Sequence, residues 1–153
     1  MLFLVFELAC DRYVLDVNQV AEVLPLVAIK QMPQTPPAVA GILNYRGAPV
    51  PVIDVSQLTL GRPAARRLST RIILVHYPVA DGSTRLLGLI AERATRTVRR
   101  EKTDFVASGV SSDGAPYLGP VAADASGLLQ WLDARTLLPP SVSDLLFRQP
   151  KAE

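Results

Sequence analysis

The sequence predicts an all-β protein built from short antiparallel strands arranged as a sandwich or as barrels. Nine or ten short segments are rich in β-branched and aromatic residues. Turn signals separate them at intervals of about 8–12 residues, which is typical of these architectures. Ten strands in 153 residues are enough to close two small barrels packed together.

The composition limits the class of protein. Apolar residues make up 49% and charged residues 20% of the chain, which excludes disorder. The net charge of +2 is not the balance of a dedicated nucleic-acid binder. Cys10 is the single cysteine, so no intramolecular disulfide is possible and a reducing compartment is expected. Because no apolar run approaches the length of a membrane span, we expect a cytoplasmic protein without membrane insertion.

The elements follow from turn residues and from periodicity. Residues 2–8 and 13–17 predict a hairpin at the start of the chain. An asparagine N-cap and a proline stop then predict a brief helix over residues 18–24, whose spacing leaves Glu22 off the buried face. Further strands are predicted at residues 27–31, 71–77, 85–92, 94–100, 117–122 and 128–132, and helical turns at 56–60, 134–138 and 143–147.

Residues 40–56, A-G-I-L-N-Y-R-G-A-P-V-P-V-I-D-V-S, are the most informative stretch. Two runs of strand formers flank a polar turn, which predicts a hairpin with Arg46 at its tip. Gly41, Asn44 and Gly47 tolerate positive φ and indicate special backbone geometry around this arginine. A guanidinium there can contact a carboxylate through two hydrogen bonds, so we expect a surface that binds protein.

Two prolines in the second strand of this hairpin predict an incomplete edge. Pro49 and Pro51 lie two residues apart, so the same edge of the strand lacks two hydrogen-bond donors. We therefore expect that one edge of residues 50–55 is not used for continuous sheet pairing. The sequence leaves open whether this edge meets solvent, another barrel or a partner.

Catalytic signatures do not emerge from the sequence. A lone strand histidine such as His76 is usually structural or exposed, and one histidine with one cysteine cannot supply a typical zinc site. No glycine-rich phosphate loop or nucleophile elbow is present. We expect neither catalytic residues nor a metal or cofactor.

The basic segment 93–102 leaves one alternative open. It fits a solvated strand face, a rim that meets an acidic partner, or a nucleic-acid-binding β-barrel. Binding of single strands usually adds stacking aromatic residues, and aromatic residues make up only 6% of this chain. We keep nucleic-acid binding as the alternative function and do not expect it.

The stretch G-I-L-N-Y-R-G-A-P-V-P-V-I-D-V resembles the signature of the CheW-like coupling domain of bacterial chemosensory systems. Other pieces follow in the family's order along nearly the whole chain: V-A-E-V, P-P-A-V-A-G, G-L-I, L-G-P-V-A and L-L-Q-W-L-D. The resemblance implies one CheW-like domain over residues 1–153, made of two packed five-stranded β-barrels. Short helices would follow the first hairpin and close the chain.

The resemblance also implies a function. CheW-like proteins are non-catalytic adaptors that link the cytoplasmic tip of a chemoreceptor to the regulatory domain of a CheA-type histidine kinase. The receptor would lie in a groove between the barrels, and Glu22 would pair with Arg46. The family's groove residues correspond here to Val20, Glu22, Gly41, Asn44 and Arg46.

Some positions depart from the family pattern. Tyr45 stands where an aliphatic residue is usual, Ala91-Glu92 where Val-Asp is common, and segment 93–102 is unusually basic. The pieces L-P-L-V-A-I-K, L-N-Y-R-G and L-L-Q-W-L resemble couplers of Wsp-type pathways, which control cyclic-di-GMP synthesis. That resemblance implies a cyclic-di-GMP output in place of flagellar control.

Overall fold

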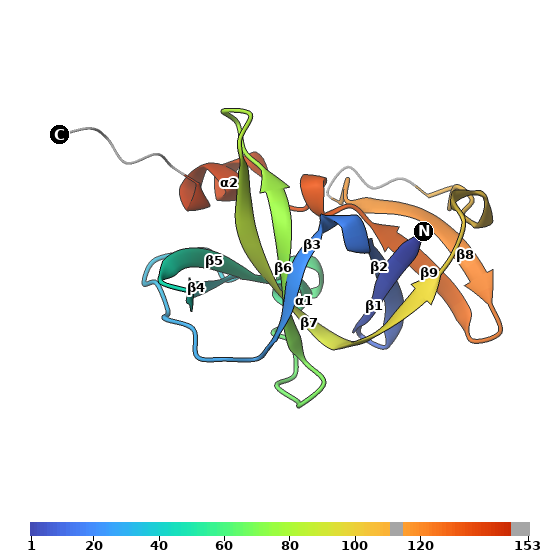
Figure 1. The fold of residues 1–153 in the computed structure, drawn as a ribbon, viewed down its shortest axis with the longest axis horizontal. Helices are drawn as coiled ribbons and strands as arrows, with labels where there is room; N and C mark the ends of the chain where they lie inside the picture. Colours follow the sequence, from blue (N-terminus) through green and yellow to red (C-terminus); the bar gives the residue numbers. More distant parts are fainter. Residues whose placement is uncertain (111–114, 148–153) are drawn as a thin grey trace.

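The strands form two barrel-like halves that lie side by side and share one long strand (Figure 1). The computed structural model describes residues 1–110 and 115–147. One half contains β3 (Val20–Pro25), β4 (Val39–Tyr45), β5 (Ala48–Asp54) and β6 (Arg71–Pro78). The other contains β1 (Leu2–Leu8), β2 (Asp11–Asp16), β8 (Leu118–Asp124) and β9 (Gly127–Leu132), and β7 (Thr84–Arg99) belongs to both. The predicted all-β class with two packed barrels is confirmed.

Strand β7 replaces two strands that the sequence predicts separately, at residues 85–92 and 94–100. It runs for 16 residues. Its first part pairs with β6 and its second part with β1. At the changeover Arg93 has a φ of 49°, and the β1–β7 register shifts between Val5 and Glu7. The strand bends there without ending, because new backbone partners replace the old ones.

The core runs through both halves. The strand β6 is covered on its two faces, so its side chains alternate between two clusters of buried residues. Ile72 and Leu74 face the core of the first half, while Ile73 and Val75 face a core that β1 and β2 share. A third cluster fills the second half with Phe3, Val14, Phe105, Ala122 and Leu129. The two barrels are therefore joined by continuous apolar packing as well as by β7.

The helix predicted over residues 18–24 is wrong. The structure has a single 3₁₀ turn at Val17–Gln19, capped by the Asp16 carboxylate, and then strand β3. Pairing of β3 with β6 outweighs the local capping signals, since a short helix is marginal without tertiary support. Burial along β3 alternates, so Glu22 lies on the same half-buried face as Val20 and Leu24. The predicted helix would place Glu22 away from the buried face.

The remaining elements are mostly as predicted. The first hairpin, the β4–β5 hairpin and the β8–β9 hairpin are confirmed, as are helices α1 (Val55–Leu60) and α2 (Pro140–Leu146). The helical turn predicted at 134–138 is a shorter 3₁₀ turn, Ala134–Thr136. The strand predicted at 27–31 is reduced to one bridge between Lys30 and Ile42. Among the described residues, no helix is long and apolar enough to cross a membrane.

Candidate functional site

The tip of the β4–β5 hairpin is a two-residue turn with an arginine in it. Arg46 and Gly47 have φ of 52° and 87°, the left-handed pair of a type I′ turn. The Asn44 side-chain oxygen accepts a hydrogen bond from the Gly47 N–H at 2.9 Å. Paired strands on both sides hold Arg46 in a conformation that costs an ordinary residue about 1–2 kcal/mol. The turn therefore presents its guanidinium at the surface, where the side chain is 76% exposed.

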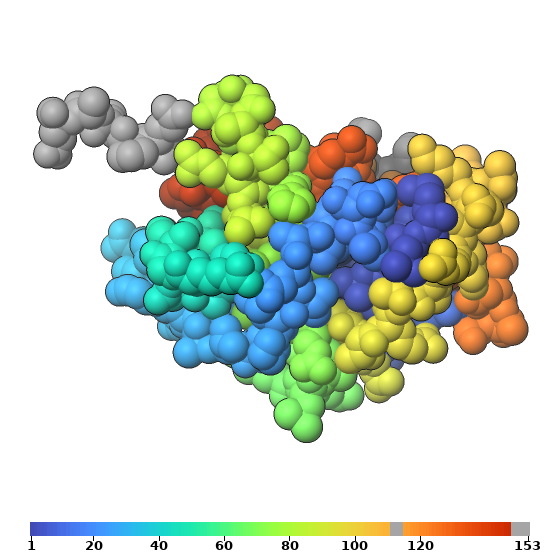
Figure 2. All heavy atoms as spheres, in the orientation of Figure 1, coloured from blue at the N-terminus to red at the C-terminus, as the bar shows by residue number. Residues whose placement is uncertain are grey.

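Three side chains from two elements meet beside this turn. The Tyr45 hydroxyl donates a hydrogen bond to Glu22 Oε2 on β3. The Arg46 guanidinium lies 3.8 Å from the same oxygen and 5.0 Å from the centroid of the Tyr45 ring. The hydrogen bond to the carboxylate raises the pKa of Tyr45 above its ordinary value. Figure 2 shows the hairpin tip lying against β3 on this face of the molecule. We call Glu22, Tyr45 and Arg46 the tip cluster.

The contacts within the tip cluster hold Arg46 only weakly. An exposed ion pair at 3.8 Å contributes about 0–1 kcal/mol. A cation–π contact at the surface adds about 0.5–1 kcal/mol. Most of the guanidinium's donors therefore stay available to a partner. Glu22, by contrast, is 37% exposed and is oriented by the tyrosine hydroxyl.

Gly41 and Val20 lie farther from the turn and have packing roles. A Cβ on Gly41 would lie 2.1 Å from the Lys30 carbonyl oxygen. This close approach lets Lys30 exchange two backbone hydrogen bonds with Ile42, at 2.9 and 2.8 Å. Val20 is half-buried against the shared core and pairs with Val75. Of the predicted site residues, the structure thus gathers three at the hairpin tip: Glu22, Asn44 and Arg46.

Tyr45 was missed as a site residue. The sequence singled it out only as a departure from the family pattern. Tyr45 lies two residues after the buried Leu43 and packs against the same apolar cluster, so its position indicates a packing role. Its partner Glu22 comes from a segment wrongly predicted as a helix. The signal that could have found it was the polar hydroxyl at an apolar position next to the predicted tip.

The strand β5 has the incomplete edge that its prolines predict. Ile42 directs its backbone groups toward Lys30, so its opposite residue, Pro51, forms a pair without hydrogen bonds to β4. The proline nitrogens therefore point away from β4. On that side β5 pairs with β7 only over residues 52–54. Pairing is thus discontinuous, and an apolar groove of about 610 Å³ opens between residues 48–51, residues 84–86 and the end of α2.

The other candidate residues carry no catalytic arrangement. His76 is exposed on β6, and Cys10 is exposed in the β1–β2 turn. Within residues 1–110 and 115–147, no three histidine, cysteine or carboxylate side chains are grouped to hold a metal. These positions offer no nucleophile–base pair in the described part of the chain.

The basic segment is partly neutralised inside the protein. Arg93 pairs with Glu7 at 3.0 Å, and Arg100 lies 3.4 Å from Asp124. Asp124 also accepts two hydrogen bonds from Arg12, at 3.0 and 2.6 Å. This contact lowers the pKa of Asp124 to about 2. Two arginines of the segment thus have internal structural roles, which weakens the nucleic-acid alternative.

The fold defines a protein of two packed β-barrels with an arginine-tipped hairpin, and comparison with known proteins gives its family. The family model for the CheW-like domain matches residues 2–140. The chain therefore belongs to the CheW-like family.

Three relatives are named chemotaxis protein CheW. The Bacillus subtilis protein is 26% identical over 138 residues, covering 88% of this chain and 85% of the relative. The Klebsiella aerogenes protein is 28% identical over 97 residues, covering 60% of this chain and 58% of the relative. The Helicobacter pylori protein is 25% identical over 104 residues, covering 67% and 59%. The matches to these last two span less than two thirds of each relative's length.

A solved structure agrees with these matches. The crystal structure of the scaffolding protein TtCheW from Thermoanaerobacter tengcongensis superposes with a TM-score of 0.79 at 25% identity. The superposition covers 92% of this chain and 89% of that protein.

Proposed function

We propose that this protein is a non-catalytic, cytoplasmic adaptor that couples the tip of a chemoreceptor to a CheA-type histidine kinase. The observation that carries the proposal is the tip cluster. Its Glu22 and Arg46 occupy positions that match the family's receptor groove, and they lie within 3.8 Å of each other. Membership of the CheW-like family supports the coupling role.

The chemistry of the tip cluster suits a helical partner that carries both charges. A guanidinium that is 76% exposed can accept a partner carboxylate in two-point contact. The Tyr45 hydroxyl holds Glu22 in place for a basic or amide side chain. Because the exposed ion pair between Glu22 and Arg46 is weak, a partner can replace this contact at little cost in free energy.

Reversing the arginine tests the receptor contact. The Arg46→Glu variant should bind a purified receptor-tip fragment at least about tenfold more weakly, since a favourable contact becomes like-charge repulsion. Arg96→Glu is the matched control, because Arg96 is also exposed but lies on β7 away from the tip. Titration calorimetry measures both affinities, and circular dichroism confirms that both variants fold.

A double-mutant cycle tests whether Glu22 and Arg46 act together. If they do, Glu22→Arg combined with Arg46→Glu should restore part of the receptor binding lost in each single variant. Strictly additive losses would argue against the pair. Equal binding by Arg46→Glu and Arg96→Glu would remove the tip cluster as the receptor site.

The kinase contact is proposed to be separate from the tip cluster. The regulatory domain of the kinase is expected to share this fold and to associate through barrel edges. Arg46→Glu should therefore leave affinity for a purified kinase regulatory domain within about twofold of wild type. A protein that binds neither the receptor tip nor the kinase domain is not this adaptor.

For the output of the pathway, we propose control of cyclic-di-GMP, because several sequence pieces resemble Wsp-type couplers. Deleting the gene should then change the cellular cyclic-di-GMP level and leave swimming bias unaltered. The reverse result would assign the protein to flagellar control. The nucleic-acid alternative predicts binding to DNA or RNA at low salt with a steep salt dependence, and absence of such binding would eliminate it.

A further inference from the structure

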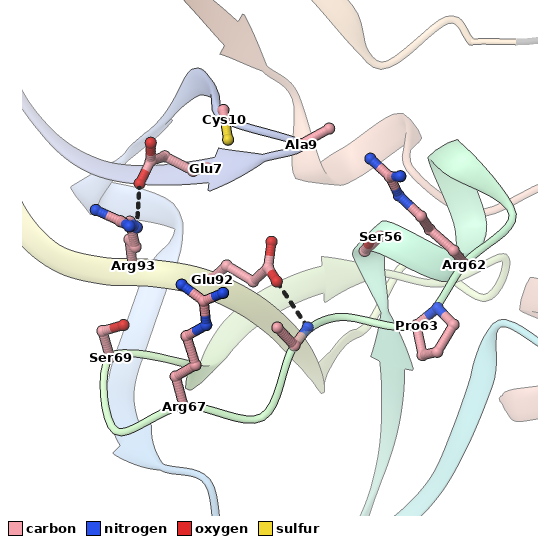
Figure 3. A pocket seen from close by; sticks show the side chains of 11 residues that line it. Glu7, Ala9, Cys10, Ser56, Arg62, Pro63, Arg67, Ser69, Glu92 and Arg93 are labelled. Carbon is pink, nitrogen blue, oxygen red and sulfur yellow. Dashed lines mark hydrogen bonds and ion pairs between the residues drawn. The ribbon is translucent and has the colours of Figure 1, made fainter.

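A second site lies where the two barrels meet, away from the tip cluster. A pocket of about 300 Å³ opens between the β1–β2 turn, α1, the loop after α1 and the bend of β7 (Figure 3). This volume is at the lower end of the range for small-molecule sites. We call it the junction pocket. Its charged lining residues are Glu7, Arg62, Arg67, Glu92 and Arg93.

The two carboxylates of the junction pocket are already engaged. Glu7 pairs with Arg93 at 3.0 Å. Glu92 accepts a hydrogen bond from the Ala65 N–H at 2.6 Å. Three arginines against two glutamates leave the pocket with a formal charge of +1. Because the Glu7–Arg93 pair is neutral, the excess positive charge lies elsewhere in the pocket.

Apart from that pair, the pocket holds Arg62 and Arg67 against one carboxylate, Glu92. Neither guanidinium has an ion pair or hydrogen bond to any residue in the described part of the chain. In Figure 3, Arg62 reaches from the loop after α1 toward the β1–β2 turn, and Arg67 reaches from the same loop toward Glu92. Both therefore direct unneutralised charge into one pocket.

A hydroxyl side chain at the start of α1 also lines the pocket. Ser56 at the start of α1 is only 3% exposed and lines the junction pocket. Its hydroxyl has no hydrogen-bond partner among residues 1–110 and 115–147. This hydroxyl is therefore available to hydrogen-bond a group that enters the pocket.

Backbone strain also gathers at this pocket. Five non-glycine residues have positive φ in the described residues, and three of them line the junction pocket: Ala9, Cys10 and Arg93. Such conformations persist where the surrounding structure enforces them, and they cluster at functional sites. Here these conformations shape the β1–β2 turn and the bend of β7, which line the pocket together with the loop that carries Arg62 and Arg67.

We propose that the junction pocket binds the phosphoryl group of a small phosphorylated molecule. Two guanidinium groups without an internal partner can donate charge-assisted hydrogen bonds to the oxygens of a phosphate monoester, which carries a charge of about −1.5 to −2 at pH 7. Arg62 and Arg67 contact the phosphoryl oxygens, and the Ser56 hydroxyl donates a further hydrogen bond. Glu7 and Glu92 also line the pocket, where Arg93 and the Ala65 N–H hold them. None of the residues of the tip cluster lines this site.

The test uses the full-length protein with inorganic phosphate and pyrophosphate as probes. Thermal unfolding is followed during titration at constant ionic strength, with chloride as compensating anion. Because a ligand that binds only the folded state raises the melting temperature, we expect a saturable rise with either probe. Calorimetry gives the dissociation constants, and succinate serves as a carboxylate dianion that should bind at least about tenfold more weakly.

Two sets of variants locate the binding. Arg62→Gln and Arg67→Gln should each raise the dissociation constant about tenfold, which is the expected loss of a charge-assisted contact. Ser56→Ala should raise it about threefold or more. The matched control is the pair of exposed β7 arginines, changed together as Arg96→Gln and Arg99→Gln, which removes two charges outside the pocket.

Three results would overturn the proposal. Absence of a saturable response to both probes would show that the pocket binds no phosphate. Equal weakening by the β7 control would reduce the effect to general charge attraction. A succinate response as strong as that of pyrophosphate would refute the phosphoryl assignment. Since Arg62 and Arg67 are exposed and the three pocket variants report separately, one misfolded variant does not prevent a decision.

Discussion

Replacing Asp54 with alanine should destabilise the first barrel more than any surface substitution. Asp54 ends β5 and caps α1, and it is only 9% exposed. Its Oδ1 accepts a hydrogen bond from the Gln57 N–H at 3.2 Å. Its Oδ2 accepts one from the buried Ala64 N–H at 3.0 Å. One carboxylate thus fixes both the helix and the loop that follows it.

The magnitude follows from these two bonds. Loss of an N-cap costs about 1 kcal/mol. Leaving the buried Ala64 N–H without a partner costs about 1–3 kcal/mol more. The unfolding free energy of Asp54→Ala should therefore fall by about 2–4 kcal/mol. For a chain of this size each kcal/mol lowers the melting temperature by about 2–4 °C, so we expect a decrease of about 5–15 °C.

Urea denaturation and calorimetry measure this loss. Asp16→Ala is the matched control, because Asp16 caps a 3₁₀ turn through an exposed hydrogen bond of 2.9 Å to the Asn18 N–H. It should lose less than about 1 kcal/mol. Asp54→Asn retains one acceptor oxygen and should fall between the two. If Asp54→Ala lost no more than Asp16→Ala, the buried Ala64 contact would not be the source of stability.

Three further predictions address pH, the hairpin and the tip cluster. Because the folded pKa of Asp124 is about 2, below its unfolded value of 3.8, its contribution to stability is complete above about pH 4 and is lost as the pH falls toward 2. In acid titrations of unfolding free energy, Arg12→Gln should flatten that decline. Gly41→Ala should lower the free energy of unfolding by about 3 kcal/mol, because the added Cβ would clash with backbone atoms at a position of positive φ. Urea denaturation measures this loss, and an unchanged midpoint would contradict the close approach. Tyr45→Phe should cost under about 1 kcal/mol of stability yet weaken receptor-tip binding about threefold to tenfold by releasing Glu22, and unaltered calorimetric affinity would refute that orienting role.

The strand pattern was predictable because most strands have clear local signals. The run I-I-L-V in β6 indicates a strand buried on both faces, and the structure confirms burial there. Strand β3 was not predictable in this way. Asn18 just before it and Pro25 at its end are local helix signals, whereas its strand conformation depends on pairing with residues 71–75, about 50 positions later. Only the tertiary fold brings β3 and residues 71–75 together.

The tip cluster shows the same division between local and distant information. The Arg46-Gly47 turn and the gap at Pro49 and Pro51 follow from backbone rules that act over a few residues. The contact of Tyr45 with Glu22 joins residues 23 positions apart. No period or motif encodes that contact, since it depends on how the hairpin is placed against β3.

That placement has a physical cause in the segment before β4. The missing Cβ of Gly41 lets Lys30 approach and hydrogen-bond Ile42, so the chain leaving β3 is fastened to the outer edge of β4. The connection from β3 therefore braces the hairpin on one side while β7 braces it on the other through residues 52–54. With both edges held, the turn stays next to β3 and keeps Arg46 exposed beside Glu22. Gly41 thus positions the site through backbone geometry.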